Sequence, residues 1–356
     1  MKLKEVSFRV VIVSCIALAL SWTSVRYAPV LKLSFVPMFI VVTILSALVL
    51  MVQIVVRQFG HYIFGVISGY EFTSIQVLNW VMVSSEYGIQ FKRYHVPKIN
   101  GQCIMKTPDV ELDELPYTLY LQGGNIANGL LTLFLIVIVL NANLGMMNQL
   151  ILVIFIIMGL VVLFVNVVPH GLFINDTEAV RTLRRSIQAR DAYVQLSGFY
   201  REQFDSSDRS HSFEFRSYPI DLVDNYYAFL VNYYYLYQKR LEIGWNECLI
   251  HLKELQGIDV KIPYVYRMQL ELEINYLQMR MSQEVPEETE QLKRYINGVM
   301  YSPQIVRYLY LKSYVQDGTL NDQLYKHFEI IAAEYPFILE NEMERHIMNI
   351  LKEELS

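Results

Sequence analysis

The sequence is poor in charged residues and in cysteine. Asp, Glu, Lys and Arg make up 18% of the 356 residues, whereas apolar residues make up 53%. This share of charge is below that of average soluble domains and indicates a membrane part joined to a soluble part. The formal net charge of −5 argues against nucleic acid as a partner. The three cysteines, Cys15, Cys103 and Cys248, have no disulfide or metal-ligand spacing, so we expect them to be inert.

Four apolar runs are close to the length of about 20 residues that a membrane-spanning helix needs. They are Val10–Trp22, Leu33–Val56, Ile126–Leu140 and Leu150–Val168. We interpret the first as an uncleaved span, because no small-residue cleavage site follows it before Arg26. Lys and Arg gather near the N-terminus, between the second and third runs, and after the fourth. The positive-inside rule then predicts that both termini are cytoplasmic.

A β-rich stretch lies between the second and third runs, and we expect it to form a β-hairpin over residues 72–98. Its two strands would be Ser74–Ser84 and Ile89–Val96, joined at Glu86-Tyr87-Gly88. Unpaired sheet edges are not tolerated in hydrocarbon. The hairpin must therefore lie at the membrane interface or line a protein cavity.

The chain past Pro169 changes to a Tyr-, Glu-, Lys- and Leu-rich composition with apolar residues at helical spacing. Helices are expected at Asp221–Gln238, Leu241–Leu255, Tyr264–Met281, Glu287–Val299, Pro303–Tyr314, Asn321–Tyr335 and Glu340–Glu354. Pairs that recur at roughly 40 residues indicate a tetratricopeptide-like solenoid, with an irregular helical bundle as the alternative. The predicted domains are a membrane domain over residues 1–190, a linker over 191–211, which includes the polar stretch Asp205–His211, and a helical-repeat domain over 212–356.

The helix predicted around Val55–Tyr70 carries the sequence Arg57-Gln58-Phe59-Gly60-His61. Residues i and i+4 share one helix face, so histidines at both positions of an H-E-x-x-H motif can bind one zinc ion. The glutamate of that motif takes a proton from the zinc-bound water. Here Arg57 and Gln58 stand at the first two motif positions. A guanidinium has no lone pair for a metal, and an amide cannot act as a base.

Two further stretches follow this one in the chain. Gly123 and Gly124 precede Asn125 and Asn128, and Asn166-Val167-Val168-Pro169 precedes Asp176. Together the three stretches resemble the site-2 protease family of intramembrane zinc metalloproteases, in a bacterial branch. The corresponding family motifs are H-E-x-x-H, G-G-P-x-x-N and N-x-x-P…D-G. The sequence departs from them at Arg57 and Gln58, at Asn125 in place of proline, and at Thr177 in place of glycine.

The resemblance implies a mainly α, polytopic membrane protein with four transmembrane helices of site-2 protease type. An interfacial β-hairpin and a C-terminal cytoplasmic α-helical repeat domain complete the expected fold. The implied location is the bacterial plasma membrane. In the family the aspartate that corresponds to Asp176 is the third zinc ligand, and the hairpin can pair with an extended substrate segment.

We therefore predict a pseudoprotease that binds or regulates a membrane-anchored peptide or partner protein. It has no expected catalytic residue, metal or other cofactor. Besides the lipid bilayer, a further expected partner is a peptide bound by the helical repeats. One alternative is an active zinc metalloprotease with a rearranged site of His61, His170 and Asp176. A second alternative is a structural subunit of a peptide-export complex.

The residues at the motif positions also lead to a structural hypothesis. A lone carboxylate or guanidinium at membrane depth is costly, and ionisable groups there usually pair. If the family fold is kept, Asp176 faces the helix that carries Arg57 and His61. We expect Arg57 and Asp176 to form a bidentate ion pair in place of the metal, with Gln58 or His61 hydrogen-bonded beside it.

Overall fold

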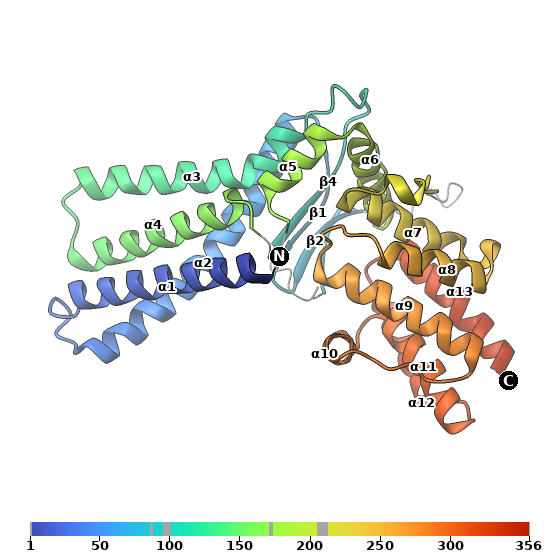
Figure 1. Cartoon of the computed structure of the whole chain (residues 1–356). Helices are drawn as coiled ribbons and strands as arrows, with labels where there is room; N and C mark the ends of the chain where they lie inside the picture. The colour runs from blue at the N-terminus through green and yellow to red at the C-terminus, as the bar shows by residue number, and fades with distance from the viewer. Residues whose placement is uncertain (1, 86–87, 95–100, 171–173, 205–212, 356) are drawn as a thin grey trace. The chain divides into compact units, whose positions relative to one another are not determined.

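The computed structural model describes residues 2–85, 88–94, 101–170, 174–204 and 213–355 (Figure 1). The chain forms two compact units, and it passes between them more than once. We call them the membrane unit (Met1–Glu71, Gly101–Cys103 and Glu114–Arg185) and the C-terminal unit (Phe72–Asn100, Ile104–Asp113 and Ser186–Ser356).

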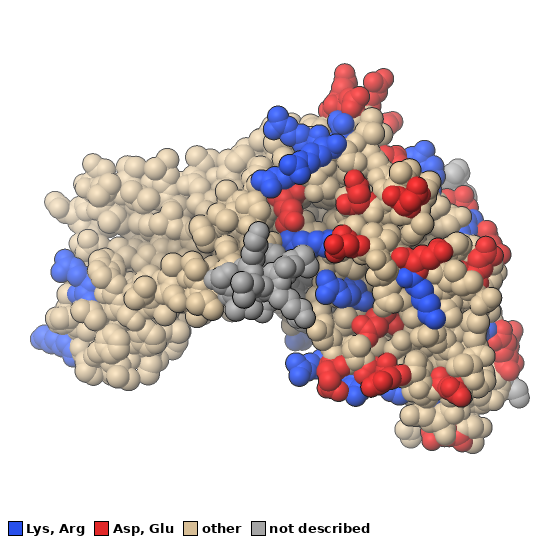
Figure 2. Space-filling view, in the orientation of Figure 1, with Lys and Arg blue, Asp and Glu red and all other residues tan. Residues whose placement is uncertain are grey.

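The membrane unit is built from four long apolar helices and a short fifth one. They are α1 (Lys2–Tyr27), α2 (Phe35–Ile67), α3 (Tyr117–Asn141), α4 (Met146–Val167) and α5 (Asp176–Arg185). The first four are long and apolar enough to cross a membrane, as the sequence predicted. Large apolar side chains stay exposed along them, which in a membrane is the surface that lipid covers. On the face shown in Figure 2, the surface of these helices is almost free of charged side chains.

The interior of the membrane unit is packed from α1, α2 and α4. Met38, Val42 and Val49 of α2 are buried against Leu150, Ile154 and Met158 of α4, and the end of α1 covers the same cluster. Helix α2 also packs along α3, where glycines allow a close approach that is described below with the site.

The β-rich stretch forms a four-stranded sheet, so the predicted hairpin over residues 72–98 is too simple. The strands are β1 (Glu71–Val77), β2 (Trp80–Ser85), β3 (Gly88–Arg93) and β4 (Gly101–Lys106), in the order β3-β2-β1-β4. The predicted single strand Ser74–Ser84 turns back at Leu78 and Asn79, where Leu78 has a φ of 54°. A leucine is a rare residue for that conformation, and Asn79, with no glycine or proline beside it, is a weak turn signal. Glu86 and Tyr87 lie outside the described residues.

The helices of the C-terminal unit follow one another with short connections. They are α6 (Ile187–Glu202), α7 (Tyr226–Ile243), α8 (Trp245–Gln256), α9 (Tyr264–Ser282), α10 (Glu290–Gly298), α11 (Pro303–Asp317), α12 (Asp322–Glu334) and α13 (Ile338–Leu355). The seven helices predicted after residue 212 are confirmed. The predicted linker over residues 191–211 is wrong in its first half, because α6 covers it and packs on α7. The predicted polar stretch Asp205–His211 lies outside the described residues.

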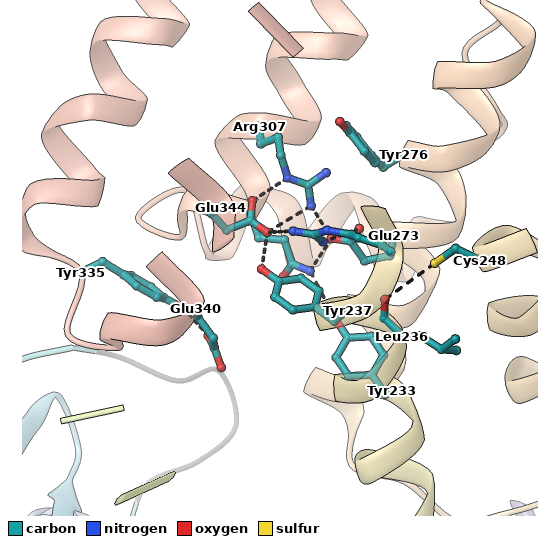
Figure 3. A network of polar contacts seen from close by, with 12 residues as sticks. Tyr233, Leu236, Tyr237, Cys248, Glu273, Tyr276, Arg307, Tyr335, Glu340 and Glu344 are labelled. Carbon is teal, nitrogen blue, oxygen red and sulfur yellow. Dashed lines mark hydrogen bonds and ion pairs between the residues drawn. The ribbon is translucent and has the colours of Figure 1, made fainter. Parts of the chain in front are cut away.

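A buried network of charges ties α7, α9, α11 and α13 together (Figure 3). Arg307 donates to Glu344 at 2.5 Å and also binds Glu273. Arg240 lies 3.5 Å from Glu273 and 3.4 Å from Glu344. Burial alone would raise the pKa of the Glu344 carboxyl, but the two arginines hold it below its ordinary value. Two cations and two anions therefore share one interior site without net charge, which makes their burial tolerable.

Glu340 lies one helical turn before Glu344 and has different surroundings. Its carboxylate accepts hydrogen bonds from the hydroxyls of Tyr335 at 3.0 Å and Tyr234 at 3.4 Å. Burial raises its pKa from 4.5 to about 7, and the nearby Glu344 adds to the rise. The carboxyl of Glu340 is therefore protonated in the folded protein at mildly acidic pH, where an unfolded chain would have lost that proton.

This difference predicts a pH-dependent stability. The folded state holds the proton between pH 4.5 and about 7, so the free energy of unfolding falls as pH rises through that window. We expect Glu340→Gln to leave stability at pH 5 nearly unchanged and to increase it at pH 8 by about 2 kcal/mol. Thermal unfolding of the purified chain from pH 5 to 8 measures this effect. Glu342→Gln, at an exposed position of the same helix, is the control, and equal pH profiles for both variants would contradict the prediction.

Candidate functional site

The membrane unit brings the three motif stretches together. Arg57 and His61 come from α2, Gly123 and Gly124 from α3, and Asp176 is the first residue of α5. Arg57 and Asp176 are 119 positions apart in the sequence and in direct contact in the structure. The sequence stretches that resemble zinc-site motifs therefore converge at one place.

Arg57 and Asp176 form the predicted ion pair. Nη2 of Arg57 lies 2.6 Å from Oδ1 and 2.8 Å from Oδ2 of Asp176. Their side chains are 18% and 12% exposed, so water screens the pair only weakly. One guanidinium nitrogen serves both carboxylate oxygens, so the expected two-nitrogen bidentate geometry is wrong. Nε of Arg57 has no hydrogen-bond partner within the described part of the chain.

His61 lies beside the pair without a hydrogen bond to it. Its Nδ1 is 3.0 Å from the carbonyl oxygen of Tyr120, and its Nε2 is 3.7 Å from Oδ2 of Asp176. A carbonyl can only accept, so Nδ1 carries the proton and donates it to Tyr120. This contact fixes the ring with Nε2 facing Asp176, in the orientation in which a histidine binds a metal. The role of Tyr120 could not be predicted from its residue type, because the contact uses its main-chain carbonyl.

Gln58 does not join the pair either, so the prediction that Gln58 or His61 is hydrogen-bonded beside it is wrong for both residues. Its side chain is buried beside Gly101, and a Cβ built at Gly101 would lie 2.7 Å from Nε2 of Gln58. Oε1 of Gln58 has no hydrogen-bond partner in the described ranges. The residue thus occupies the interior next to Arg57 but directs its amide toward the start of β4.

Asn175 holds Asp176 in place and was missing from the predicted site. Its Oδ1 accepts a hydrogen bond from the backbone N–H of Glu178 at 3.0 Å, which caps the N-terminus of α5. Its Nδ2 donates to the carbonyl of Val168 at 2.7 Å, just past the end of α4. One side chain therefore joins the two helix ends and fixes where α5 begins. The available sequence signal was an Asn at the expected N-cap position.

The glycine pair of α3 is a point of close helix contact. A Cβ at Gly123 would lie 2.7 Å from the carbonyl oxygen of Gly60 on α2. A Cβ at Gly124 would lie 2.5 Å from Nε2 of His61 and 2.6 Å from Cγ of Arg57. All three distances are shorter than real Cβ contacts, so a larger residue at either position would force α3 or its neighbours to shift.

The remaining predicted residues lie in α3, in α4 and just after α4. Asn128 is fully buried, and its carboxamide has no hydrogen-bond partner among the residues described. Asn166 donates to the carbonyl of Val162 in its own helix at 2.8 Å, and Pro169 follows the end of α4. His170 contacts the carbonyl of Val165 at 3.0 Å and stacks on Phe8 at 4.5 Å between ring centroids.

These residues do not fit a zinc ion. Nη2 of Arg57 holds both oxygens of Asp176, and a structural or catalytic zinc needs at least three protein ligands. His170, the substitute ligand of the alternative site, is directed to α1 and to the end of α4. Over the ranges that the structure describes, no three His, Cys, Asp or Glu side chains are grouped to hold a metal. Burial raises the pKa of the nearby Cys103 thiol to about 12, so it stays protonated and is a poor ligand.

No family model, no curated protein and no solved structure matches the chain.

The contact at Gly124 predicts a sharp position dependence on α3. Gly124→Ala places a methyl group against His61 and Arg57 and should lower the free energy of unfolding by about 1–3 kcal/mol. Gly129→Ala is the matched control, because its Cβ would meet its nearest neighbour at 3.9 Å, an ordinary contact. Thermal unfolding in detergent measures both variants. Equal effects at the two positions would show that α2 and α3 are not in close contact.

The ion pair predicts non-additive mutational effects. Arg57→Met and Asp176→Asn each leave one poorly solvated charge without its partner, so each should destabilise the protein by about 2–4 kcal/mol. The double variant should lose less than the sum of the two. The exposed pair Glu290 and Lys293 is the control, and its cycle of Glu290→Gln and Lys293→Met should show no measurable coupling. Additive losses at Arg57 and Asp176 would contradict a functional ion pair.

Proposed function

We propose that this chain is a membrane pseudoprotease of site-2 protease type that holds a membrane-anchored peptide or partner without cutting it. The observation that carries the proposal is the contact of Arg57 with Asp176. In the family that the motifs resemble, the corresponding positions bind one zinc ion. Here an ion pair joins them.

The chemistry of the three positions supports a loss of catalysis with retention of the scaffold. The guanidinium of Arg57 offers no lone pair and binds the carboxylate that would otherwise be a ligand. Gln58 cannot take a proton from water. His61 nevertheless keeps the orienting contact with Tyr120, and Gly124 keeps the space in front of it. In this proposal the site differs from the family motif at Arg57 and Gln58 and agrees with it at His61 and Gly124.

Binding of an extended peptide is supported by the open sheet. The outer strands β3 and β4 each have one strand neighbour in the described sheet. A strand with an open edge can pair with an extended peptide through main-chain hydrogen bonds. β3 also exposes Ile89 and Phe91, which are 61% and 71% exposed, as apolar contacts for such a peptide. We place the protein in the bacterial plasma membrane with both termini in the cytoplasm, on the distribution of Lys and Arg.

The proposal is tested by restoring the motif. The double substitution Arg57→His and Gln58→Glu recreates H-E-x-x-H opposite Asp176, and we expect it to bind one zinc ion per chain. Elemental analysis and the visible spectrum of the cobalt-substituted variant measure this without an activity assay. Wild type should bind no stoichiometric zinc, because Arg57 removes a ligand and occupies Asp176.

Two outcomes would contradict the proposal. Adding Asp176→Asn to the restored variant should abolish its zinc binding, and persistence of the zinc would mean that another site binds it. Stoichiometric zinc in the wild type that is lost in His61→Ala would favour the rearranged-site protease instead. If the restored variant cleaves membrane-anchored peptides, the sequences it cuts identify the class of segment that the wild type holds.

A further inference from the structure

A short segment of the C-terminal unit lies on two helices in the way that a bound peptide does. The segment Phe213–Pro219 precedes α7 and belongs to no helix or strand in the described chain. It lies on what we call the α6–α7 face, formed by Gln195, Gly198 and Phe199 of α6 and Asn232, Tyr234 and Gln238 of α7. This face is distinct from the site in the membrane unit.

The segment is held through both its backbone and its side chains, and three amide side chains hold the backbone. Gln238 donates to the carbonyl of Phe213 at 2.9 Å and accepts from the N–H of Phe215 at 3.4 Å. Gln195 accepts from the N–H of Arg216 at 2.8 Å. Asn232 accepts from the N–H of Tyr218 at 2.7 Å and donates to its carbonyl at 2.8 Å. Amide side chains can supply both a donor and an acceptor, so they take the place of a neighbouring strand.

The side chains of the segment alternate between the face and the solvent. The Phe215 ring lies 4.9 Å from that of Phe199 and stacks on Tyr234 at 5.6 Å. The Phe213 ring lies over Gly198, where a Cβ would come within 2.9 Å of it. Glu214 and Arg216 have side chains that are 69% and 76% exposed, and they form surface ion pairs with the two helices, Glu214 with Lys239 of α7 at 3.2 Å and Arg216 with Asp191 of α6 at 2.9 Å. Extended peptides are recognised in this way, because main-chain contacts supply affinity and pockets for alternate side chains supply specificity.

The connections of this unit differ in how they are held. Between α8 and α9 the described main-chain bonds are local, such as Val260 to Ile258. At the start of α13, Oε1 of Gln203 accepts from the backbone N–H groups of Leu339 and Glu340 at 3.1 and 3.3 Å. Phe213–Pro219 differs in that three amide side chains from two helices hold its backbone.

The face also extends beyond what the segment fills. A cavity of about 420 Å³ lies beside residues 217–220, lined by Asn232 and Leu236 of α7 and by His251 and Leu255 of α8. A peptide with larger side chains at its C-terminal end gains contacts there that Ser217 and Pro219 do not make.

We propose that the α6–α7 face is a binding site for an extended peptide with aromatic residues at alternate positions, and that Phe213–Pro219 occupies it as an internal ligand. The partner is an extended segment of another protein with the same alternation. Covalent attachment gives the internal segment an effective concentration on the order of millimolar, so a partner must exceed that competition. The inference does not depend on the proposed loss of zinc.

The test uses the full chain in detergent and a fluorescent peptide with the sequence of residues 213–219. In the variant Phe213→Ser, Phe215→Ser the internal segment loses both rings, and we expect the peptide to bind at least about tenfold more tightly than to wild type, by fluorescence anisotropy. The matched control is Glu214→Ser, Arg216→Ser, which keeps both rings and removes only two exposed ion pairs, so it should increase peptide binding far less than the loss of the rings does. A peptide of the same composition with its two phenylalanines adjacent should bind neither variant.

Two results would overturn the proposal. One is a folded variant that binds the peptide no better than wild type, and the other is equal binding of the two peptides. If the variant fails to fold, hydrogen exchange in the wild type decides. Millimolar peptide should speed the exchange of the Phe215, Arg216 and Tyr218 amides and leave the amides of α8 unchanged. Unchanged protection of those three amides would show that peptide does not displace the segment and that the segment has only a structural role.

Discussion

The close contact between α2 and α3 is the constraint on which the membrane site depends. Gly60 and Gly123 let the two backbones approach so nearly that a Cβ on either would meet a carbonyl oxygen of the other at 2.6–2.7 Å. That approach brings the carbonyl of Tyr120 within reach of His61, and Gly124 leaves room for the side chains of His61 and Arg57. The orientation of His61 and the position of Arg57 follow from this contact. Asn175 then brings Asp176 to them from the other side of the unit.

In both units, each buried arginine is paired with a carboxylate. Arg57 is matched by Asp176, and Arg240 and Arg307 are matched by Glu273 and Glu344. In each place the charges cancel locally, because an unpaired charge in a low-dielectric interior costs more than the pair returns. Among the described residues no cation contacts Glu340, and burial raises its pKa. Glu344 on the same helix is buried as well, but the two arginines beside it hold its pKa low.

The sequence predicted those parts of the structure whose signal is periodic or motif-like. Apolar runs and helical spacing gave the four spans and the helices from α7 to α13, and the aspartate in the third motif stretch gave the contact of Asp176 with Arg57. The features that were not predicted depend on backbone conformation, on main-chain contacts or on tertiary packing. Leu78 turns the chain with a positive φ that its residue type disfavours, and Tyr120 acts through its carbonyl. The predicted linker overlaps helix α6, where Gln188, Arg190, Asp191 and Gln195 interrupt the apolar residues.

In the proposed function, Arg57 has two effects. It offers no lone pair to a metal, and it binds the carboxylate of Asp176, so that neither charge is left without a partner. A zinc site built at these positions would therefore need two changes. A histidine at position 57 alone would supply a third ligand without a base for water. A glutamate at position 58 alone would add a second carboxylate beside an arginine that already has one. Metal affinity and water activation would thus be separable at these positions.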